Sequence, residues 1–395
     1  MSRAETQVGI VGAGPAGLLL SHLLDREGIA SVVLEKRTQD YVERRVRAGV
    51  LEQGTVDLLC ASGLGERLRR ESLVHHGIEL RFDGWRHRIP LSELTGGRAI
   101  TIYGQQEIVR DLIAARRAAG GAVHFEIDDV SVAGIESDSP SLRYAHAGRT
   151  VELRCAFIAG CDGFHGVCRN AIPRAALRIY EREYPFGWVG VLAAVPPSTD
   201  EVVYACHERG LAMHSMRSPE LSRLYLQCGP ADVIEQWSDA RIWEELQRRL
   251  ATRDGWALKE GPILEKSIAS LRSFVAEPMQ HGRLFLAGDA AHIVPPTGAK
   301  GLNLAVSDVR LLAEALVDWF RKGRRELLDS YSERCLRRVW RVQHFSAWMT
   351  SVLHRPVDDA SGFERRLQLA QLAHVTSSRA AATSLAENYV GLERV

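Results

Sequence analysis

The first 35 residues carry the pattern that most restricts the fold of this chain. A buried strand is predicted at residues 8–11, and it leads directly into Gly12-Ala13-Gly14-Pro15-Ala16-Gly17 and a leucine-rich helix that Gly28 ends. A second strand at residues 31–34 ends at Glu35. Glycines allow a tight turn and close approach of phosphate, while a carboxylate at the second strand end can accept hydrogen bonds from ribose hydroxyls. Three glycines alone are a weak signal, but strand, helix and acid in register predict a dinucleotide-binding βαβ unit.

Two later segments repeat the arrangement of a strand that ends in a glycine-rich turn. Residues 157–160 lead into Cys161-Asp162-Gly163. Residues 284–287 lead into the loop 288–303, which begins Gly288-Asp289, holds two prolines and precedes a long amphipathic helix that Gly323 ends. Each segment alone is more simply an ordinary strand, turn and helix start. Together with the N-terminal unit, these strand ends predict a sheet that binds one large cofactor.

The pattern changes to alternating β-branched and aromatic residues between about residues 184 and 264. Asp83-Gly84 joins two further alternating runs and predicts a hairpin. We therefore expect an antiparallel sheet with one face toward a ligand or solvent. Ser215 and Arg217 are two residues apart and share a face, where a hydroxyl and a guanidinium could hold a small carboxylate. An exposed strand is the simpler alternative.

Length and composition limit the classes of protein to which the chain can belong. At 395 residues it is long enough for two or three domains, and 46% hydrophobic with 25% charged residues is ordinary for a globular protein. A net charge of +1 argues against a dedicated nucleic-acid or membrane-surface binder. The seven cysteines form no Cys-x-x-Cys pair, which suits a reducing cytoplasm and no structural zinc. We expect no signal peptide and no membrane-spanning helix.

Two groups of ionisable residues have a structural as well as a functional interpretation. The adjacent His75 and His76 are expected to be a partly solvated pair, because too few other ligands are at hand for a metal. Lys36, Arg45 and Arg47 belong to a basic segment that follows the acidic end of the second strand. Such charge runs are usually solvated faces, but guanidinium groups placed directly after a nucleotide-binding acid could also bind phosphate.

Together, the three glycine-rich strand ends resemble the three signatures of the single-component flavoprotein aromatic hydroxylases. The resemblance covers nearly the whole chain and is strongest to the branch of that family that hydroxylates 4-hydroxybenzoate. Its most specific stretches are residues 47–53, 159–166, 185–188, 278–303 and 386–392. It implies a mixed α/β fold with a discontinuous Rossmann-like FAD-binding domain (1–74, 98–182 and 268–345), an inserted antiparallel-sheet substrate domain (75–97 and 183–267) and a C-terminal helical interface region (346–395).

The resemblance also implies an activity. It predicts an FAD-dependent monooxygenase that converts 4-hydroxybenzoate to 3,4-dihydroxybenzoate with O₂ and NADPH, or NADH, through a flavin C4a-hydroperoxide and a substrate activated as phenolate. It further implies a cytoplasmic homodimer of aromatic catabolism, with a small aromatic acid as substrate and no nucleic-acid, membrane or metal partner. Three alternatives remain open: another phenolic acid as substrate, a flavin reductase or oxidase without hydroxylation, and a flavin-bound regulatory protein.

The site residues are implied by the resemblance, position by position. The substrate carboxylate is expected at Ser215, Arg217 and Tyr225, and the substrate phenol at Tyr204 and the Pro296 carbonyl. FAD is expected to contact Gly12, Gly14, Gly17, Glu35, Arg47, Gln105, Asp289, Gly298 and Asn303. Catalytic roles fall to Tyr204, Tyr389 and Pro296, to His75 near the surface as the end of a proton path, and to Lys300 and Asn303, which would stabilise negative charge on the reduced flavin.

The nicotinamide donor is expected to meet a third set of residues, several of them also linked to flavin movement: Lys36, Tyr41, Arg45, Arg47, His165, Arg223 and Arg272. The loop around Gly298 would supply the mobility that this movement needs. The chain also departs from its relatives. Ala16 stands where a serine is frequent, and Met213 and Val202 stand where leucine is more usual, so the pocket shape stays open.

Overall fold

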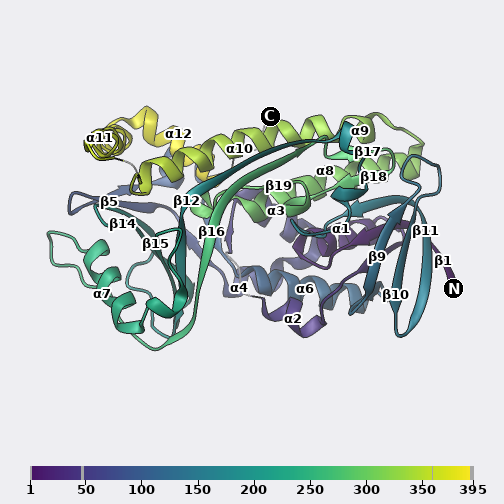
Figure 1. The fold of residues 1–395 in the computed structure, drawn as a ribbon, viewed down its shortest axis with the longest axis horizontal. Coiled ribbons are helices and arrows are strands. Elements are labelled where there is room, and N and C mark those ends of the chain that lie inside the picture. Colours follow the sequence, from purple (N-terminus) through teal and green to yellow (C-terminus); the bar gives the residue numbers. More distant parts are fainter. Residues whose placement is uncertain (1, 46–48, 358, 392–395) are drawn as a thin grey trace.

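Two eight-stranded sheets form the body of the protein, as the computed structural model shows for residues 2–45, 49–357 and 359–391 (Figure 1). They lie toward opposite ends of an elongated molecule, and the long helix α10 (Tyr331–Leu353) runs along its length. A small third sheet joins β3 (Val50–Leu51), β7 (Ile100–Ile102) and β4 (Leu73–His75). The mixed α/β fold predicted from the sequence is confirmed.

The first sheet contains the predicted βαβ unit. Its strands in spatial order are β17 (Gln280–His281), β18 (Leu284–Leu286), β11 (Arg149–Gly160), β1 (Ser2–Val11), β2 (Ser31–Leu34) and β8 (Ala122–His124), with β10 (Ser141–His146) and β9 (Asp128–Ala133) beside β11. From β18 to β8 every pairing is parallel. Because parallel strands place their carboxyl ends at one edge, the three glycine-rich turns meet there.

Three helices cover this sheet. Helix α1 (Pro15–Arg26) packs against α6 (Gln105–Ala118) and α8 (Gly301–Lys322), and it buries Leu18, Leu20 and Leu24 in the core. Helix α8 ends at Gly323, whose φ of +68° is in the left-handed region that glycine tolerates best. The predicted stop of this helix is confirmed.

The second sheet is antiparallel with one exception. Its order is β19 (His292–Ile293), β16 (Ile263–Glu277), β12 (Arg178–Ala193), β15 (Leu221–Cys228), β14 (Gly210–Ser218), β13 (Val202–His207), β5 (Ile78–Phe82) and β6 (Trp85–Ile89). Asp83-Gly84 turns the predicted β5–β6 hairpin. The pair β13–β5 is parallel, because the hairpin comes from a distant part of the chain and joins as a block.

The two faces of the second sheet pack against different helices. One face packs against α7 (Asp239–Leu250), whose N-terminus is capped by the Ser238 hydroxyl oxygen, which accepts from the Arg241 N–H. The other contributes Tyr204 and Met213 to a core shared with α10 and α12 (Arg379–Val390). Helix α11 (Phe363–Ser377) packs against α10 and α12. The remaining α-helices of the described residues are α2 (Gln39–Arg44), α3 (Gln53–Leu59), α4 (Gly65–Glu71), α5 (Leu91–Leu94) and α9 (Glu326–Asp329).

The boundaries of the three predicted parts stay a prediction, because β12 and β16 run from one sheet region to the other without a break (Figure 1). Among the described residues, none of the helices combines the length and the apolar character that a membrane span requires.

Replacing Gly323 with alanine tests the role of its backbone conformation. We expect the free energy of unfolding to fall by about 1 kcal/mol, because a side chain disfavours the left-handed region. Gly54→Ala, inside α3 with no atom within 4 Å of the new Cβ, is the matched control and should raise stability slightly. Urea unfolding followed by circular dichroism measures both, and equal effects of the two substitutions would contradict the assignment.

Candidate functional site

Two glycines of the first turn are required by the packing of the protein itself. A Cβ on Gly17 would lie 2.0 Å from the Gly12 carbonyl oxygen, and one on Gly12 would lie 2.3 Å from the Cys161 carbonyl oxygen. Gly12 also has a φ of +103°. The first glycine-rich turn therefore packs directly against the second, at the end of β11.

Gly14 and Gly301 have no such explanation inside the protein. No atom lies within 4 Å of a Cβ built on either residue. Gly14 caps the N-terminus of α1 and Gly301 begins α8, and neither helix has an acidic residue in its first turn. The positive ends of two helices thus face open space, as binding of anionic or electron-rich groups requires. This edge of the sheet therefore has room for a cofactor with an anionic group at α1 and a second electron-rich group at α8.

The carboxylate at the end of β2 is held in place by backbone hydrogen bonds. The Glu35 carboxylate accepts hydrogen bonds from the backbone N–H groups of Ala13, at 2.7 Å, and Arg37, at 2.8 Å. Asp289 is exposed at the end of β18, and Gln105 is half-buried at the start of α6. The structure therefore brings the expected FAD contacts Gly12, Gly14, Gly17, Glu35, Gln105 and Asp289 to one edge; Arg47 lies outside the described residues.

A buried pair that the sequence analysis missed supports the loop at Asp289. His292 Nε2 lies 2.6 Å from an Asp308 carboxylate oxygen, and the same oxygen accepts a hydrogen bond from the Gly288 N–H at 3.0 Å. Burial alone would lower the pKa of His292, but the Asp308 charge outweighs it and raises this pKa. The charged pair ties the turn to α8. Residues 288–303 contain His292, but only the fold shows that Asp308 meets it.

On the second sheet, Tyr204, Met213 and Tyr225 lie opposite one another in neighbouring strands and form one row. The Tyr204 hydroxyl lies 2.5 Å from the Tyr389 hydroxyl of α12 and donates to the Thr297 carbonyl at 3.0 Å. Burial raises the pKa of both phenols, so both stay protonated at neutral pH. The predicted contact between the two tyrosines is present.

The neighbouring positions carry the candidate carboxylate site. Ser215 lies opposite Arg223, and the Arg223 Nε donates to the Tyr225 hydroxyl at 3.3 Å. Arg217 is half-buried two residues further along β14, next to an irregularity in the pairing of β14 with β15. Burial lowers the pKa of Arg217, although an arginine stays charged at neutral pH. The hydroxyl groups of Ser215 and Tyr225 and the guanidinium group of Arg217 thus lie on the same sheet.

Lys300 links the two halves of the site. Its ammonium group is buried, 2.7 Å from Glu52 and 2.8 Å from the Tyr389 carbonyl oxygen. Arg338 also contacts Glu52, at 2.5 Å. Burial by itself would raise the pKa of Glu52, but the two cations outweigh it and lower this pKa. Glu52 lies inside the motif at residues 47–53, although no local pattern distinguishes it from its neighbours.

Asn303 is already fully hydrogen-bonded. Its side-chain oxygen accepts from the Glu52 N–H at 2.9 Å and the Thr55 hydroxyl at 2.8 Å. Its amide group donates to the Val50 and Ala299 carbonyl oxygens. These four bonds are the capacity of the side chain, so any contact of this amide with a flavin would replace one of them.

In the loop at residues 296–300, the carbonyl that meets Tyr204 is not the one of Pro296. The Pro296 carbonyl accepts a hydrogen bond from the Ala299 N–H, and Thr297, which the sequence analysis missed, supplies the carbonyl that Tyr204 meets. A Cβ on Gly298 would lie 3.0 Å from the Ser346 hydroxyl oxygen of α10. Close packing, and not a special backbone angle, accounts for this glycine. Mobility of the loop stays a prediction.

The expected surface position of His75 is wrong. His75 is 2% exposed, and neither ring nitrogen has a hydrogen-bond partner among the described residues. Burial lowers its pKa to about 4. Only His76 is exposed, so the two do not form a solvated pair. His75 ends β4 with its side chain buried, and His76 follows the strand with its side chain exposed.

The expected donor residues fall into separate groups. Tyr41, exposed on α2, lies under the guanidinium groups of Arg37 and Arg45, at 5.2 and 5.9 Å from its ring centre. Lys36 precedes this helix. His165 packs against Phe164, and Arg272 lies over the same Phe164 ring while pairing with Glu181 and Glu183. Arg223 instead lies opposite Ser215 and contacts Tyr225 on the second sheet, and Arg47 lies outside the described residues.

Several known proteins are similar to this chain. The family model described as FAD binding domain matches residues 5–346. p-Hydroxybenzoate hydroxylase of Acinetobacter baylyi is 49% identical over 392 residues, covering 99% of this chain and 96% of that protein. Dialkyldecalin synthase of Streptomyces rugosporus is 29% identical, over 82% of this chain and 68% of its own length. The structure of p-nitrophenol 4-monooxygenase from Pseudomonas putida, 20% identical, shares the fold with a TM-score of 0.83 and 100% coverage of both chains.

Two glycine substitutions should distinguish a glycine that the packing of the protein requires from one that leaves room for a ligand. Gly17→Ala should lower the free energy of unfolding by about 1–3 kcal/mol, because its Cβ would overlap the Gly12 carbonyl. Gly14→Ala should leave the apoprotein as stable as before but weaken FAD binding by about tenfold or more, because its Cβ enters the open space. Urea unfolding of apoprotein and titration with FAD measure the two effects. Unchanged FAD affinity in Gly14→Ala would contradict the assignment.

Proposed function

Because this chain belongs to the FAD-dependent aromatic hydroxylases, we propose that it hydroxylates 4-hydroxybenzoate to 3,4-dihydroxybenzoate with O₂ and a reduced nicotinamide. The observation that supports this most directly is the buried contact between the hydroxyls of Tyr204, on the same sheet as Arg217, and Tyr389 of α12. Tyr204 pairs with Met213, and Ser215 lies two residues further along β14, a span of about 7 Å that is on the scale of one benzene ring with its substituents; Arg217 lies two residues beyond Ser215. A phenol at Tyr204 and a carboxylate at Ser215 and Arg217 therefore suit one para-substituted aromatic acid.

The tyrosine pair serves to accept a proton from the substrate phenol. Because both pKa values are raised, a free tyrosinate is unfavourable at neutral pH. Tyr204 therefore accepts the phenol proton when its own hydrogen turns from the Thr297 carbonyl to Tyr389, which passes its proton on to water. The phenolate that results is the more nucleophilic form of the ring. The later exit of the proton by way of His75 is part of the proposal, although its burial requires a movement that opens this path.

The other residues bind, orient and exclude water. FAD, when bound, supplies the redox chemistry that activates O₂. The N-terminal end of α8 provides positive potential where reduction adds negative charge to the flavin, and buried Lys300 adds to it. The closed core between the second sheet, α10 and α12 keeps water from the reacting atoms.

The remaining details also belong to the proposal. NADPH is favoured as the donor because Tyr41 and Arg45 offer an aromatic face and a cation to a 2′-phosphate, although Asp40 and Glu43 oppose it. Two exposed apolar residues of α11, Phe363 and Leu367, support a homodimer through the C-terminal helices. All seven cysteines are free thiols, which supports the cytoplasm.

Donor oxidation by the FAD-loaded protein tests the function. NADPH and NADH would be added separately, with and without 4-hydroxybenzoate, while 3,4-dihydroxybenzoate and hydrogen peroxide are assayed. We expect strong stimulation by the phenol and mainly dihydroxy product. Stimulation with mainly peroxide would favour another phenolic acid, to be sought with a panel of analogues, and no stimulation would favour a reductase or oxidase.

Arg217→Ala should raise the KM for 4-hydroxybenzoate by about 10–100-fold, because one charge-assisted contact to the carboxylate is lost. Steady-state kinetics at saturating donor measure this change. Arg248→Ala, on the exposed side of α7 where Arg248 pairs with Glu244, is the control and should leave KM unchanged. An unchanged KM in Arg217→Ala would contradict the proposed carboxylate site.

Tyr204→Phe should still allow substrate-stimulated donor oxidation but lower the yield of dihydroxy product by at least about tenfold, with peroxide formed instead. The reason is that the phenol loses its general base, which typically contributes 10²- to 10⁴-fold. Stopped-flow reduction and product analysis separate the two steps. Tyr180→Phe, at an exposed tyrosine, is the control. Full coupling in Tyr204→Phe would contradict the proton transfer.

A further inference from the structure

A strongly basic cavity lies away from the residues described so far. It has a volume of about 400 Å³ and opens where α7, the β13–β14 turn, the end of β15 and the segment after α10 meet. Four arginines and two carboxylates line it, an excess of two positive charges: Arg209, Arg241, Arg249, Arg355, Asp232 and Glu245. None of the expected FAD, substrate or donor residues is among them.

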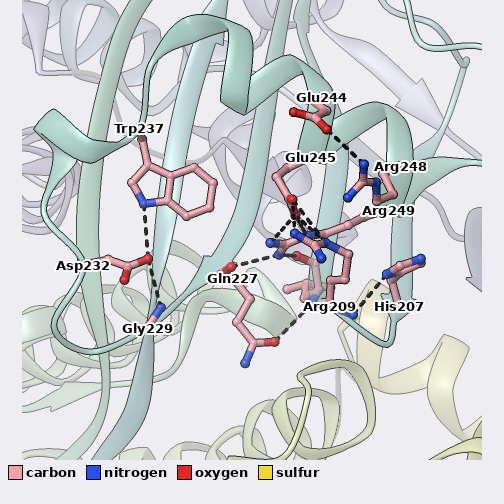
Figure 2. Close-up of polar contacts among 11 residues, drawn as sticks. His207, Arg209, Gln227, Gly229, Asp232, Trp237, Glu244, Glu245, Arg248 and Arg249 are labelled. Atoms are coloured by element: carbon pink, nitrogen blue, oxygen red, sulfur yellow. Dashed lines mark hydrogen bonds and ion pairs between the residues drawn. The ribbon is translucent and has the colours of Figure 1, made fainter.

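Three of the charged groups form a rigid wall (Figure 2). Glu245 accepts hydrogen bonds from both Arg209 and Arg249, and Arg249 also donates to the Gln227 carbonyl oxygen at 2.9 Å. Burial would raise the pKa of Glu245, but the two guanidinium groups lower it to about 2. Arg249 is therefore engaged in supporting the wall, and Glu245 is neutralised by its two partners.

A second wall positions Arg241. Asp232 accepts from the indole N–H of Trp237 at 3.2 Å and from the Gly229 N–H at 3.3 Å, which fixes the indole ring (Figure 2). The Arg241 guanidinium lies 4.1 Å from the centre of this ring and donates one hydrogen bond, to the Gln236 carbonyl oxygen. Stacking holds the guanidinium flat and leaves its other N–H groups for a ligand.

Arg355 approaches from the segment after α10. Its backbone N–H donates to the Gln227 side-chain oxygen at 2.8 Å, and its carbonyl accepts from the Gln227 amide at 3.1 Å. The backbone of Arg355 is thus fixed, while its side chain is exposed at the cavity. Among the described residues, Arg241 and Arg355 form no ion pair with a carboxylate. Both residues line the same cavity, where one anion could accept charge-assisted hydrogen bonds from both guanidinium groups.

We propose that this cavity binds a small oxyanion with two negative charges, held by Arg241 and Arg355. Inorganic phosphate and a short dicarboxylate share this chemistry. The apolar part of the lining includes Phe186 and three prolines, Pro185, Pro230 and Pro356, while the charged groups supply most of the polar contacts. The site does not depend on the hydroxylase reaction, and its test is independent of that reaction.

Isothermal titration of the FAD-loaded full chain with inorganic phosphate, at ionic strength held constant with NaCl, tests the site. Arg241→Gln/Arg355→Gln should weaken saturable binding by about tenfold or more, because two charge-assisted contacts are lost. Arg248→Gln is the matched control: Arg248 is on the same helix, but it pairs with Glu244 outside the cavity (Figure 2). It should bind phosphate like the unmodified protein.

Two further measurements keep the result clear. Arg355→Gln alone, at an exposed side chain, guards against misfolding of the double variant and should also weaken binding. Succinate in place of phosphate distinguishes a dicarboxylate from inorganic phosphate as the preferred ligand, and weakening by the same substitutions supports the site in either case. The proposal is overturned if neither anion binds saturably. It is also overturned if both bind all variants equally, as binding at the basic segment near Tyr41 would produce.

Discussion

The buried ion pair of Lys300 and Glu52 is the interaction on which the arrangement of the site depends. Lys300 begins α8 from the loop at residues 296–300, Glu52 precedes α3, Arg338 belongs to α10, and the Tyr389 carbonyl comes from α12. Removing one partner of such a buried pair typically costs about 3–5 kcal/mol, because the other charge stays in an apolar surrounding. A shift of any one of these four segments would therefore disturb the contacts that hold the other three.

This constraint couples the two ends of the candidate active site. The loop that carries Lys300 also carries Thr297, whose carbonyl receives the Tyr204 hydroxyl, and the helix that meets Lys300 carries Tyr389. The position of α8, at the proposed flavin end, and the position of the tyrosine pair, at the proposed substrate end, are set by the same contacts. Such shared contacts keep α8 and the tyrosine pair at a fixed distance from each other, as a reaction between a bound cofactor and a bound substrate requires.

Charge near the site is used in two different ways. At His292 and Asp308 a pair of opposite charges is closed off from solvent and supports the turn that presents Asp289. At the distant cavity Arg209, Glu245 and Arg249 support a wall in the same manner, whereas Arg241 lies over the Trp237 ring and forms no ion pair with a carboxylate among the described residues. Whether a charged group is neutralised by its neighbours or directed to open space separates a structural role from a binding role.

The sequence by itself determined the local elements and the nucleotide-binding edge, because strand, turn and helix depend on residues close together in the chain. Gly12, Glu35 and Asp162 could be assigned to strand ends, and parallel strands bring such ends together. Tertiary structure alone decided that Asp308 supports Gly288, that Thr297 meets Tyr204, and that His75 is buried. Those contacts join residues far apart in the chain, and no local pattern records which side chains the packing of sheets and helices will place face to face.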